Sequence, residues 1–323
     1  MPSGWSETCK GLTQPLRRQM GRHKPEGRAL LRIRLGLVLG VMVVFSITPM
    51  GAGLFSRLLT DSGFNAQAEN LDAAFLRVHV LDVGKADAVL LESQGCTALL
   101  DAGTSEDGET VADYLHRQGI EKLDYAIVSH PDSDHIGGMA QVLAEIPAAC
   151  FLRGEYWEEP GQEAADLQKL LAERGVPQRL LAPGESFSLG CASLTVLGPL
   201  EDYKDSNNNS LVLKLACSDF TALFCGDMEK KAEKDLLASG ADISADFLKV
   251  AHHGSRTSTT EDFARAVSPR LAVVSVGADN NNLPRQEPLS ALEKVGAYVL
   301  RTDLDGNLLF SYNGERISIR KDA

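Results

Sequence analysis

The fold and chemistry of this chain are decided chiefly by His130-Pro131-Asp132-Ser133-Asp134-His135-Ile136-Gly137-Gly138, which directly follows the apolar run of residues 125–129. The apolar run predicts a buried strand, and the two glycines predict that a helix starts beside them and extends to about residue 145. Side chains two positions apart in an extended loop point the same way. We therefore expect the first histidine and both aspartates to converge on one cavity, with the second histidine next to it.

This concentration of imidazoles and carboxylates predicts a metal site. Two histidines and two aspartates within six residues would repel one another or lose solvation badly at the end of a buried strand, and a divalent cation resolves that conflict. A solvated acidic loop with incidental histidines is the alternative interpretation. It is disfavoured because the loop leaves a fully apolar strand and ends in two glycines.

Two further strand ends carry the same residue types. Phe224-Cys225-Gly226-Asp227 ends one predicted strand, and residues 247–250 lead into Ala251-His252-His253-Gly254-Ser255. Alone, Asp227 is typical of a strand-end cap, and a lone histidine is usually structural. Ligand sites in α/β folds gather at strand ends, so the three clusters together indicate one site.

Asp101 ends a third apolar run, residues 97–101, and allows two interpretations. It either accepts a hydrogen bond that orients a ligand histidine or caps a turn. Strands and helices continue to about residue 320 without an internal linker or repeat, which predicts one domain. Asn313-Gly314 predicts a type I′ turn in a final hairpin.

Charge divides the chain unevenly. Its 323 residues hold 32 Lys+Arg against 44 Asp+Glu, a formal net charge of −12. Residues 1–34 contain eight basic and two acidic residues, a net +6, so the remainder carries −18. Hydrophobic residues make up 44% of the chain, which excludes disordered, collagen-like and coiled-coil classes. A broad basic surface that coats nucleic acid is also disfavoured.

Residues 35–56 carry no charge and follow the basic segment, which predicts a transmembrane anchor or the apolar region of a signal peptide. The basic side is expected to stay cytoplasmic, so the later residues lie outside. A signal peptide would be cut near residues 51–53 or 66–68. The expected divisions are a basic cytoplasmic segment 1–34, the apolar segment 35–56, a linker 57–74 and a hydrolase domain 75–323.

Six cysteines are present, without a CxxC pattern. Cys9 falls on the predicted cytoplasmic side, and the odd number that remains leaves at least one free thiol. Buried small hydrophobic residues are the expected role, and one disulfide remains open.

Taken together, these motifs resemble the metallo-β-lactamase superfamily. More narrowly, they are similar to the extracellular hydrolase domain of ComEC-type DNA-uptake competence proteins, here in a standalone form. Residues 81–88, 205–210 and 301–306 resemble further motifs of that family. The resemblance implies a four-layer αββα sandwich with a dinuclear site of zinc or manganese between the sheets.

The resemblance implies a set of metal ligands, namely His130, Asp132, Asp134, His135, Asp227 and His253. The first two would hold one ion and the next two the other, with Asp227 bridging. One histidine of the pair 252/253, for which we favour His253, would complete the first ion.

Further residues are implied in the reaction or around it. Asp134 or Asp227 would orient the attacking hydroxide, and His252 would contact the substrate or a developing charge. Positions implied to contact substrate or to support the ligands are Asp87, Asp101, Asn208, Ser255 and Arg285.

Arg285 departs from the family pattern. It stands where the resemblance places a histidine that completes the second ion, and arginine stays protonated and cannot ligate. The second metal site is therefore expected to be weakened, lost or completed by water. The role open to Arg285 instead is to hold a substrate phosphate. Lys85 and Ala86 replace Gln and Gly in the opening motif, a lesser departure.

The predicted function is a membrane-anchored or secreted metal-dependent hydrolase, most simply a phosphodiesterase or nuclease that uses a metal-activated hydroxide. Two alternatives stay open: hydrolysis of cell-wall phosphoesters such as phosphocholine, and a degenerate extracellular binding or sensing module. β-Lactam hydrolysis is disfavoured because Asp132 replaces the usual histidine. Four basic residues are expected to line a substrate groove, namely Lys85, Lys249, Arg256 and Arg285.

Overall fold

The computed structural model describes residues 74–157, 161–278 and 282–322. The chain divides into two compact units, residues 1–66 and 67–323, and the sheets and helices below belong to the second unit. The predicted basic segment and the predicted transmembrane or signal helix lie outside the described residues. Within the described residues, no helix is both long enough and apolar enough to span a bilayer.

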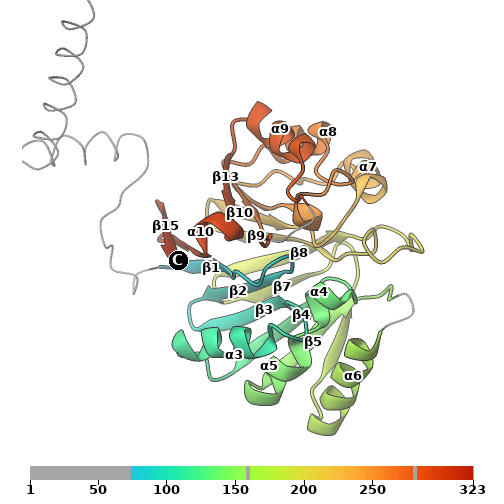
Figure 1. The fold of residues 1–323 in the computed structure, drawn as a ribbon, viewed down its shortest axis with the longest axis vertical. Coiled ribbons are helices and arrows are strands. Elements are labelled where there is room, and N and C mark those ends of the chain that lie inside the picture. Colours follow the sequence, from blue (N-terminus) through green and yellow to red (C-terminus); the bar gives the residue numbers. More distant parts are fainter. Residues whose placement is uncertain (1–73, 158–160, 279–281, 323) are drawn as a thin grey trace, which may run out of the picture. The chain divides into compact units, whose positions relative to one another are not determined.

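Two mixed β-sheets form the centre of the unit (Figure 1). The first has the strand order β15 (Ile317–Asp322), β14 (Asn307–Tyr312), β1 (Leu76–Val80), β2 (Ala88–Ser93), β3 (Cys96–Ala102), β4 (Leu123–Val128), β5 (Ala148–Gly154) and β6 (Gln178–Leu181). The second has the order β13 (Tyr298–Arg301), β12 (Leu271–Val274), β11 (Phe247–Lys249), β10 (Phe220–Phe224), β9 (Val212–Cys217), β8 (Ala192–Gly198) and β7 (Ser186–Leu189).

Helices cover the outer face of each sheet (Figure 1). The first sheet packs against α3 (Gly108–Arg117), α5 (Met139–Glu145) and α6 (Gln162–Arg174). The second packs against α7 (Lys230–Ser239), α8 (Glu261–Val267) and α9 (Gln286–Lys294). A third apolar cluster fills the space between the sheets. These layers make the αββα sandwich that the resemblance implies.

Alternating side chains explain why the central strands look continuously apolar. In β4, Ile127 points into the core between the sheets, whereas its neighbours Ala126 and Val128 point toward the helices. In β10, Phe224 faces the inter-sheet core and Leu223 the helix side. Successive strand residues point to opposite faces, so a strand buried on both faces needs an apolar residue at every position.

Parallel pairing brings the loops with polar residues to one edge of each sheet. Strands β3, β4 and β5 are parallel neighbours in the first sheet, and β10, β11 and β12 are parallel neighbours in the second. Parallel neighbours end at the same edge. The loops after β3 and β4 therefore lie together, as do those after β10 and β11.

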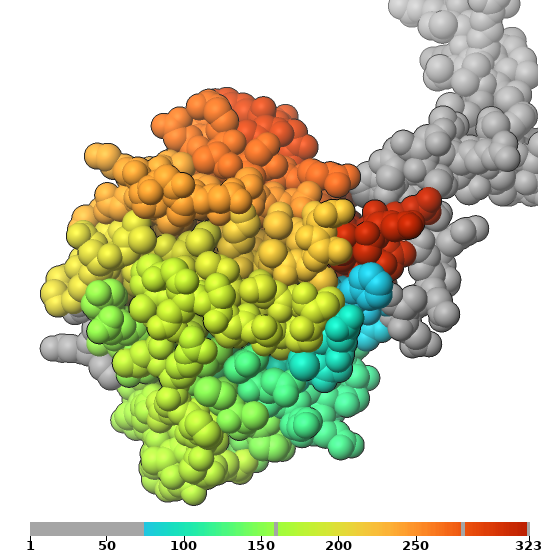
Figure 2. All heavy atoms as spheres, turned by 180° about the vertical axis from the view of Figure 1, so that it is seen from behind, coloured from blue at the N-terminus to red at the C-terminus, as the bar shows by residue number. Residues whose placement is uncertain are grey.

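The C-terminal hairpin differs from its predicted turn. Strand β14 pairs with β15 from Tyr312 to Ile317, which leaves a four-residue loop. Gly314 has a φ of +97°, but Asn313 is not among the positive-φ residues, so a type I′ turn is wrong. The Asn313 side chain instead accepts the backbone N–H groups of Glu315 and Arg316. Figure 2 shows these last strands, in red, against the start of β1, in blue.

The five cysteines that the structure describes are free. Cys217 and Cys225 are buried, as expected for small hydrophobic residues, and burial raises the pKa of the Cys217 thiol to about 12. Cys191 is exposed, yet its Sγ lies 3.1 Å from Sγ of Cys217. Cys9 lies outside the described residues.

Gly138 permits the first helix layer to approach the sheet. A Cβ atom at this position would lie 2.2 Å from the carbonyl oxygen of Ala102 and 2.9 Å from Cα of Gly108. Real Cβ atoms do not approach other atoms this closely. Since the neighbours here are backbone atoms, they cannot move aside as the end of a flexible side chain could.

We therefore expect Gly138→Ala to lower the free energy of unfolding by about 1–3 kcal/mol, the cost of overpacking. Urea unfolding followed by circular dichroism measures this. Gly154→Ala is the matched control, because its Cβ would meet only Leu211, at 4.0 Å. Equal stabilities for the two variants would contradict the close packing inferred at Gly138.

Candidate metal centre

The helix predicted beside the two glycines is α5, which follows Gly138 and ends at Glu145. The loop before it is not extended as expected, because a short helix, α4 (Ser133–Ile136), starts directly after Asp132. The carbonyl oxygen of Asp132 accepts the N–H groups of His135 and Ile136. Asp134 and His135 thus project from one helical turn and not from an extended loop.

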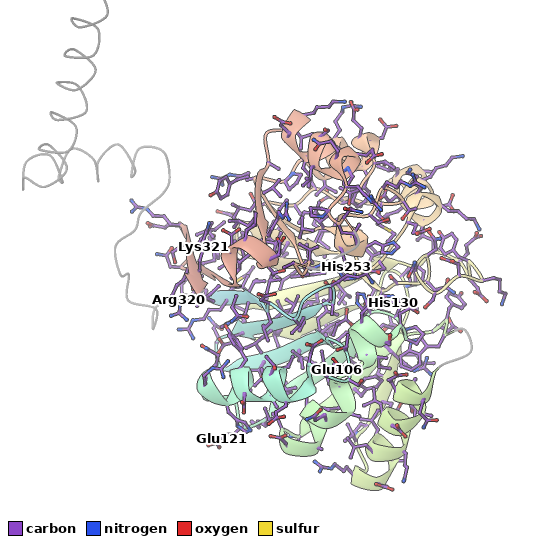
Figure 3. All side chains as sticks on the ribbon, viewed as in Figure 1. Glu106, Glu121, His130, His253, Arg320 and Lys321 are labelled. Carbon is purple, nitrogen blue, oxygen red and sulfur yellow. The ribbon has the colours of Figure 1, made fainter. Side chains whose placement is uncertain are left out.

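Four donors gather between the two halves of the fold: Asp134, His135, Asp227 and His253, here called the four-donor cluster. Their ligand atoms all lie within 4.8 Å of one another. Nε2 of His135 is 3.1 Å from Oδ1 of Asp227, and Nε2 of His253 is 3.5 Å from Oδ2 of Asp134. Figure 3 shows His253, from the second sheet's half, beside His130 from the first.

Several buried ligand atoms in this region lack a well-formed hydrogen bond. They are the Nε2 atoms of His130, His135 and His253 and Oδ1 of Asp227, whose close contacts within the described residues are ion pairs with one another or with neighbouring aspartates. Burying an unpaired polar atom is costly. Imidazole nitrogens with carboxylate oxygens are typical ligands of zinc and other divalent transition metals. The residues present therefore fit one divalent ion in the four-donor cluster.

Hydrogen bonds at the opposite ring nitrogens aim these histidines inward. Nδ1 of His135 lies 2.9 Å from Asp101, Nδ1 of His130 lies 3.0 Å from the Ser129 hydroxyl, and Nδ1 of His253 lies 3.0 Å from the Ser275 carbonyl. Such contacts fix the ring orientation and leave Nε2 for a metal. Sequence reasoning missed both serines, although Ser129 precedes His130 directly.

Asp101 accepts a hydrogen bond from a ligand histidine, His135, as one of its two interpretations predicts. Its carboxylate also accepts the backbone N–H and the hydroxyl of Ser129, both at 2.7 Å. Its own backbone is left-handed, with a φ of +59°. His252 and His253 share this conformation, with φ of +50° and +51°. Such strain is common at functional sites, where the surrounding structure holds it in place.

Neighbouring charges shift the pKa values of the buried histidine and aspartate side chains in opposite directions. Burial alone would lower the pKa of His135, but Asp227 and Asp101 raise it well above its usual value. Burial alone would raise the pKa of Asp227, but His253 and His135 hold it well below the usual range. Burial, together with the neighbouring His135, lowers the pKa of His130. Opposite charges of this kind stabilise each other's ionised forms.

Asp87 lies behind the ligands in a buried ion pair. Its carboxylate is 2.8 Å from Nζ of Lys249, and its Oδ1 is 3.6 Å from Nδ1 of His253. Lys249 is only 2% exposed, so its predicted place along a substrate groove is wrong. Lys249 lies on β11 inside the fold, where the carboxylate of Asp87 pairs with its ammonium group.

His253 lies with other ligands than the resemblance implies. His253 joins Asp134 and His135, whereas the resemblance placed it with His130 and Asp132. Nε2 of His252 is 3.6 Å from Oδ2 of Asp227, and its Nδ1 is 3.3 Å from Glu229. His252 keeps 19% of its side chain exposed, so a substrate can reach it.

Two other predicted residues stand beside the cluster and not within it. Asp132 is 42% exposed, with Oδ2 3.7 Å from Nε2 of His130, and its other oxygen accepts the Ser206 hydroxyl. Ser255 is partly buried and bonds the Thr257 hydroxyl. Neither belongs to the group of mutually close donors.

Asn208 serves the fold. Its side chain bonds Asp205 and accepts the N–H of Ala232 in α7. The same loop contributes Ser210, whose hydroxyl accepts the backbone N–H of Asp227 at 2.9 Å. This loop therefore positions the Asp227 turn.

Arg285 is exposed and directly precedes α9. Its backbone N–H donates to the carbonyl oxygen of Gly254 at 2.8 Å, which ties this loop to the histidine turn. Its guanidinium forms no hydrogen bond or ion pair with other described residues. It supplies no ligand, as its chemistry requires.

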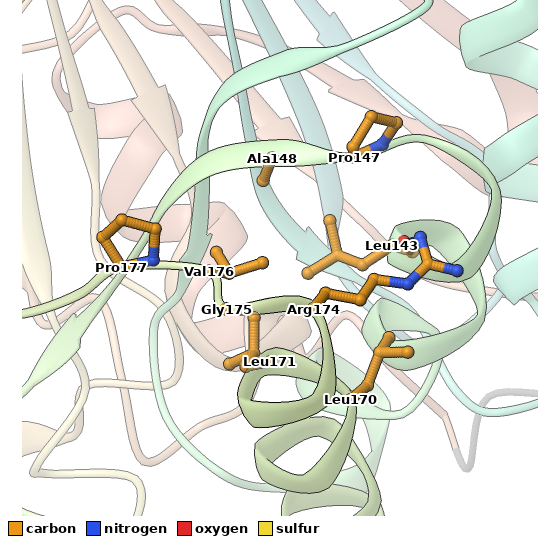
Figure 4. A pocket seen from close by; sticks show the side chains of 9 residues that line it. All are labelled: Leu143, Pro147, Ala148, Leu170, Leu171, Arg174, Gly175, Val176 and Pro177. Carbon is orange, nitrogen blue, oxygen red and sulfur yellow. Dashed lines mark hydrogen bonds between the residues drawn. The ribbon is translucent and has the colours of Figure 1, made fainter.

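An apolar pocket of about 380 Å³ lies elsewhere, between the ends of α5 and α6 and the start of β5 (Figure 4). Arg174 spans its edge and donates to the carbonyl oxygens of Leu143 and Ala144. None of its lining residues belongs to the histidine and aspartate set. This pocket is therefore separate from the four-donor cluster.

Comparison with known proteins places this geometry in a family. The model of the metallo-beta-lactamase superfamily matches residues 81–278. The "ComE operon protein 3" of Bacillus subtilis is 31% identical over 258 residues, which cover 73% of this chain and 33% of that protein. The "Competence protein ComA" of Neisseria gonorrhoeae is 30% identical over 280 residues, 85% of this chain and 38% of that protein. This chain thus spans little more than a third of these relatives.

A solved structure shares the fold. The metallo-beta-lactamase fold protein YhfI from Bacillus subtilis aligns with a TM-score of 0.51 and 13% identity, over 73% of this chain and 99% of that one. At this identity the likeness concerns the fold alone.

We expect metal to stabilise the protein through the four-donor cluster. An ion that binds only the folded state at 100 times its Kd adds about 2.7 kcal/mol to the free energy of unfolding. Thermal unfolding with and without Zn²⁺ or Mn²⁺ should show a raised midpoint for the wild type and almost none for Asp227→Asn. Asp132→Asn, outside the cluster, should keep most of the shift. An unchanged shift in Asp227→Asn would contradict the assignment.

Removing Lys249 should be far more damaging than removing a surface lysine. Lys249→Met leaves Asp87 buried without its partner, which costs about 3–5 kcal/mol of unfolding free energy. Lys294→Met breaks an exposed pair with Glu261 and should cost less than about 1 kcal/mol. Chemical denaturation measures both variants. Similar losses in the two variants would show that the buried ion pair does not carry this stability.

Proposed function

Because this chain belongs to the metallo-beta-lactamase superfamily, we propose that it is a metal-dependent phosphodiesterase, and a nuclease in particular. The observation that carries the proposal is the four-donor cluster, whose ligand atoms lie within 4.8 Å of one another. Mixed nitrogen and oxygen donors suit the divalent ions that hydrolases use on phosphoesters.

A divalent ion held by Asp134, His135, Asp227 and His253 would supply a Lewis acid and lower the pKa of bound water. The protein's own residues do the rest. Asp227 and Asp134 present carboxylate oxygens that can orient the attacking water. Asp101, Ser129 and Ser275 hold the imidazoles in place. Preorganised ligands of this kind do not need to move during the reaction.

His252 is placed to act on the substrate. It is the partly exposed member of the histidine pair, and Glu229 and Thr257 face its Nδ1. These contacts leave Nε2 directed at Asp227, 3.6 Å away. We assign His252 to stabilising charge that develops on the phosphate or the leaving oxygen.

The names of the curated relatives favour DNA as the substrate. The relative from Neisseria gonorrhoeae is called a competence protein, and a third relative, from Haemophilus influenzae and 28% identical over 255 residues, is called "Recombination protein 2", which suggests DNA handling for this chain too. Lys85, which contacts Asp134, and two exposed arginines near the histidine turn, Arg256 in sequence and Arg285 through its backbone bond to Gly254, suit a phosphodiester. The uncharged run 35–56, with its basic flank, supports a membrane-anchored or secreted protein with the site outside the cytoplasm.

A second candidate is a small phosphoester such as a phosphocholine-bearing wall component. The net charge of −18 outside residues 1–34 favours it, because an acidic surface repels long nucleic acid but admits a small or cationic ester.

Metal-dependent cleavage by the full chain, purified in detergent, is the expected result. With Zn²⁺ or Mn²⁺ the wild type should cleave single-stranded DNA or bis(p-nitrophenyl) phosphate, and chelation should stop it. Asp227→Ala and His130→Ala should reduce the rate by about 100-fold or more, as loss of metal ligands or their supports does. A phosphocholine ester run in parallel separates the second candidate. Equal rates in wild type and both variants would refute a metal-centred reaction.

A further inference from the structure

Two cysteine thiols lie in contact at one end of the second sheet. Cys191 lies in the turn between β7 and β8, and Cys217 ends β9. Their Sγ atoms are 3.1 Å apart, although the residues are 26 positions apart in the sequence. The sulfur atoms of a disulfide are about 2.05 Å apart, so the two thiols need to approach by only about 1 Å to form a bond.

The strands around the pair already hold the two residues side by side. Strands β8 and β9 are antiparallel neighbours, and Ser193 faces Ala216 in their register. Cys191 and Cys217 lie just beyond this facing pair, at the same end of the two strands. A bond between their side chains would therefore join neighbouring strands without a change in the order or register of the sheet.

Contacts with the first sheet fix the turn that carries Cys191. Oγ of Ser93, at the end of β2, accepts the backbone N–H of Cys191 at 3.2 Å and donates to the carbonyl oxygen of Phe75 at 3.0 Å. A Cβ atom on Gly190 would lie 2.0 Å from the carbonyl oxygen of Ser93, so the turn packs tightly on this strand. A turn packed in this way has little room to carry Sγ of Cys191 away from Cys217.

We propose that Cys191 and Cys217 form an oxidisable pair, which a small-molecule disulfide converts into a disulfide bond that fastens the turn between β7 and β8 to the end of β9. This modification site is independent of the metal centre and of the proposed function. Strand β10 starts opposite Cys217, where Phe220 is its partner, and runs from there toward Asp227. The thiol pair therefore lies at the opposite end of that strand from the four-donor cluster.

The unequal exposure of the two thiols sets the order of the reaction. Cys191 is exposed, whereas Cys217 is only 1% exposed and burial raises the pKa of its thiol to about 12. The thiolate is the attacking species in such exchanges, and the attacking sulfur must be accessible to the oxidant. The first attack therefore belongs to Cys191, and Cys217 acts second, on a sulfur atom that is already beside it.

Both steps are thiol–disulfide exchanges. The thiolate of Cys191 attacks one sulfur of the small disulfide, which breaks the disulfide's S–S bond, releases one thiolate and leaves a mixed disulfide on the protein. Cys217 then loses its proton, and its sulfur attacks Sγ of Cys191 and releases the second thiolate. The two cysteines are oxidised to one disulfide, the small disulfide is reduced to two thiols, and those thiols take up the two protons that the cysteines lose.

The predicted position of this domain outside the cytoplasm favours the oxidised form. Disulfides form and persist outside the cytoplasm, and the uncharged run 35–56 with its basic flank predicts that the later residues lie there. The exposed thiol of Cys191 would then meet such oxidants directly.

Peptide mapping tests whether the bond forms. The full chain, purified in detergent and fully reduced, is incubated at low protein concentration with oxidised glutathione and then mapped by mass spectrometry without reductant. Chymotrypsin cuts at Phe220, which separates Cys217 from Cys225. We expect the peptides of Cys191 and Cys217 to be joined in most wild-type chains, and dithiothreitol to separate them again.

Urea unfolding tests whether the bond fastens the turn. A bond between residues 26 positions apart restricts the unfolded chain, so oxidation should raise the ratio of folded to unfolded wild-type protein by about 30-fold or more. Circular dichroism of the oxidised and reduced forms measures this ratio. Cys191→Ser should show no change on oxidation, and Cys217→Ala should behave alike while it keeps the buried site apolar. Cys150→Ser, on β5, is the matched control and should gain as much as the wild type.

Thiols of Cys191 and Cys217 that stay reduced in the wild type would overturn the proposal. So would a bond from Cys191 to a different cysteine, a mixed disulfide that persists on Cys191, or an unchanged ratio of folded to unfolded protein after oxidation. A chain that forms the expected bond but hydrolyses no phosphoester would refute the proposed function alone.

Discussion

The burial of like and unlike charges between two sheets is the constraint on which this structure depends. Asp87, Asp101 and Asp227 are almost entirely inaccessible, and so are three histidines around them. A buried carboxylate is tolerated only when a cation or several donors face it. Lys249, Ser129 and the imidazoles meet part of that demand, and the remaining buried ligand atoms form a group that could hold a metal ion.

This demand explains the unusual backbone around the centre. Asp101, His252 and His253 adopt left-handed φ angles, and the Gly226 turn does the same before Asp227. Asp101 lies at the end of β3, and the other residues follow within four positions of the end of β10 or β11, strands that pair with a neighbour on both sides. The rigid sheets therefore offset the local strain, and the side chains are held at an edge where regular strands could not place them.

Much of this arrangement could be predicted from residue types at strand ends. The apolar runs before His130 and Asp227 and the paired histidines indicated the two half-sites, and the structure brings them together. What sequence could not provide was partnership across the chain. Lys249 looked like a surface cation because its partner Asp87 is 162 residues away, and hydrophobic periodicity does not reveal which polar pairs neutralise each other inside.

Local details failed for a similar reason. The turn of α4 begins at Ser133 because the carbonyl oxygen of Asp132 captures two N–H groups, a contact that competes with the extended loop that residue alternation suggests. In the final hairpin, the Asn313 side chain accepts two backbone N–H groups and so replaces the compact turn that Asn-Gly normally favours. In both cases a local hydrogen bond from a polar group stabilises one backbone conformation over another that the residue types alone would also allow.

The pairing of β1 with β14 has a consequence for how such a domain is built into proteins. Leu76 faces Tyr312 of β14 in the register, and β14 also pairs with β15, so the first and last strands of the described fold lie on either side of the same strand. The loops that carry the ligands follow β3, β4, β10 and β11, and none of them needs to move when polypeptide is added before β1 or after β15. A fold of this kind can be joined to further polypeptide at either end without displacing the loops that carry the ligand residues.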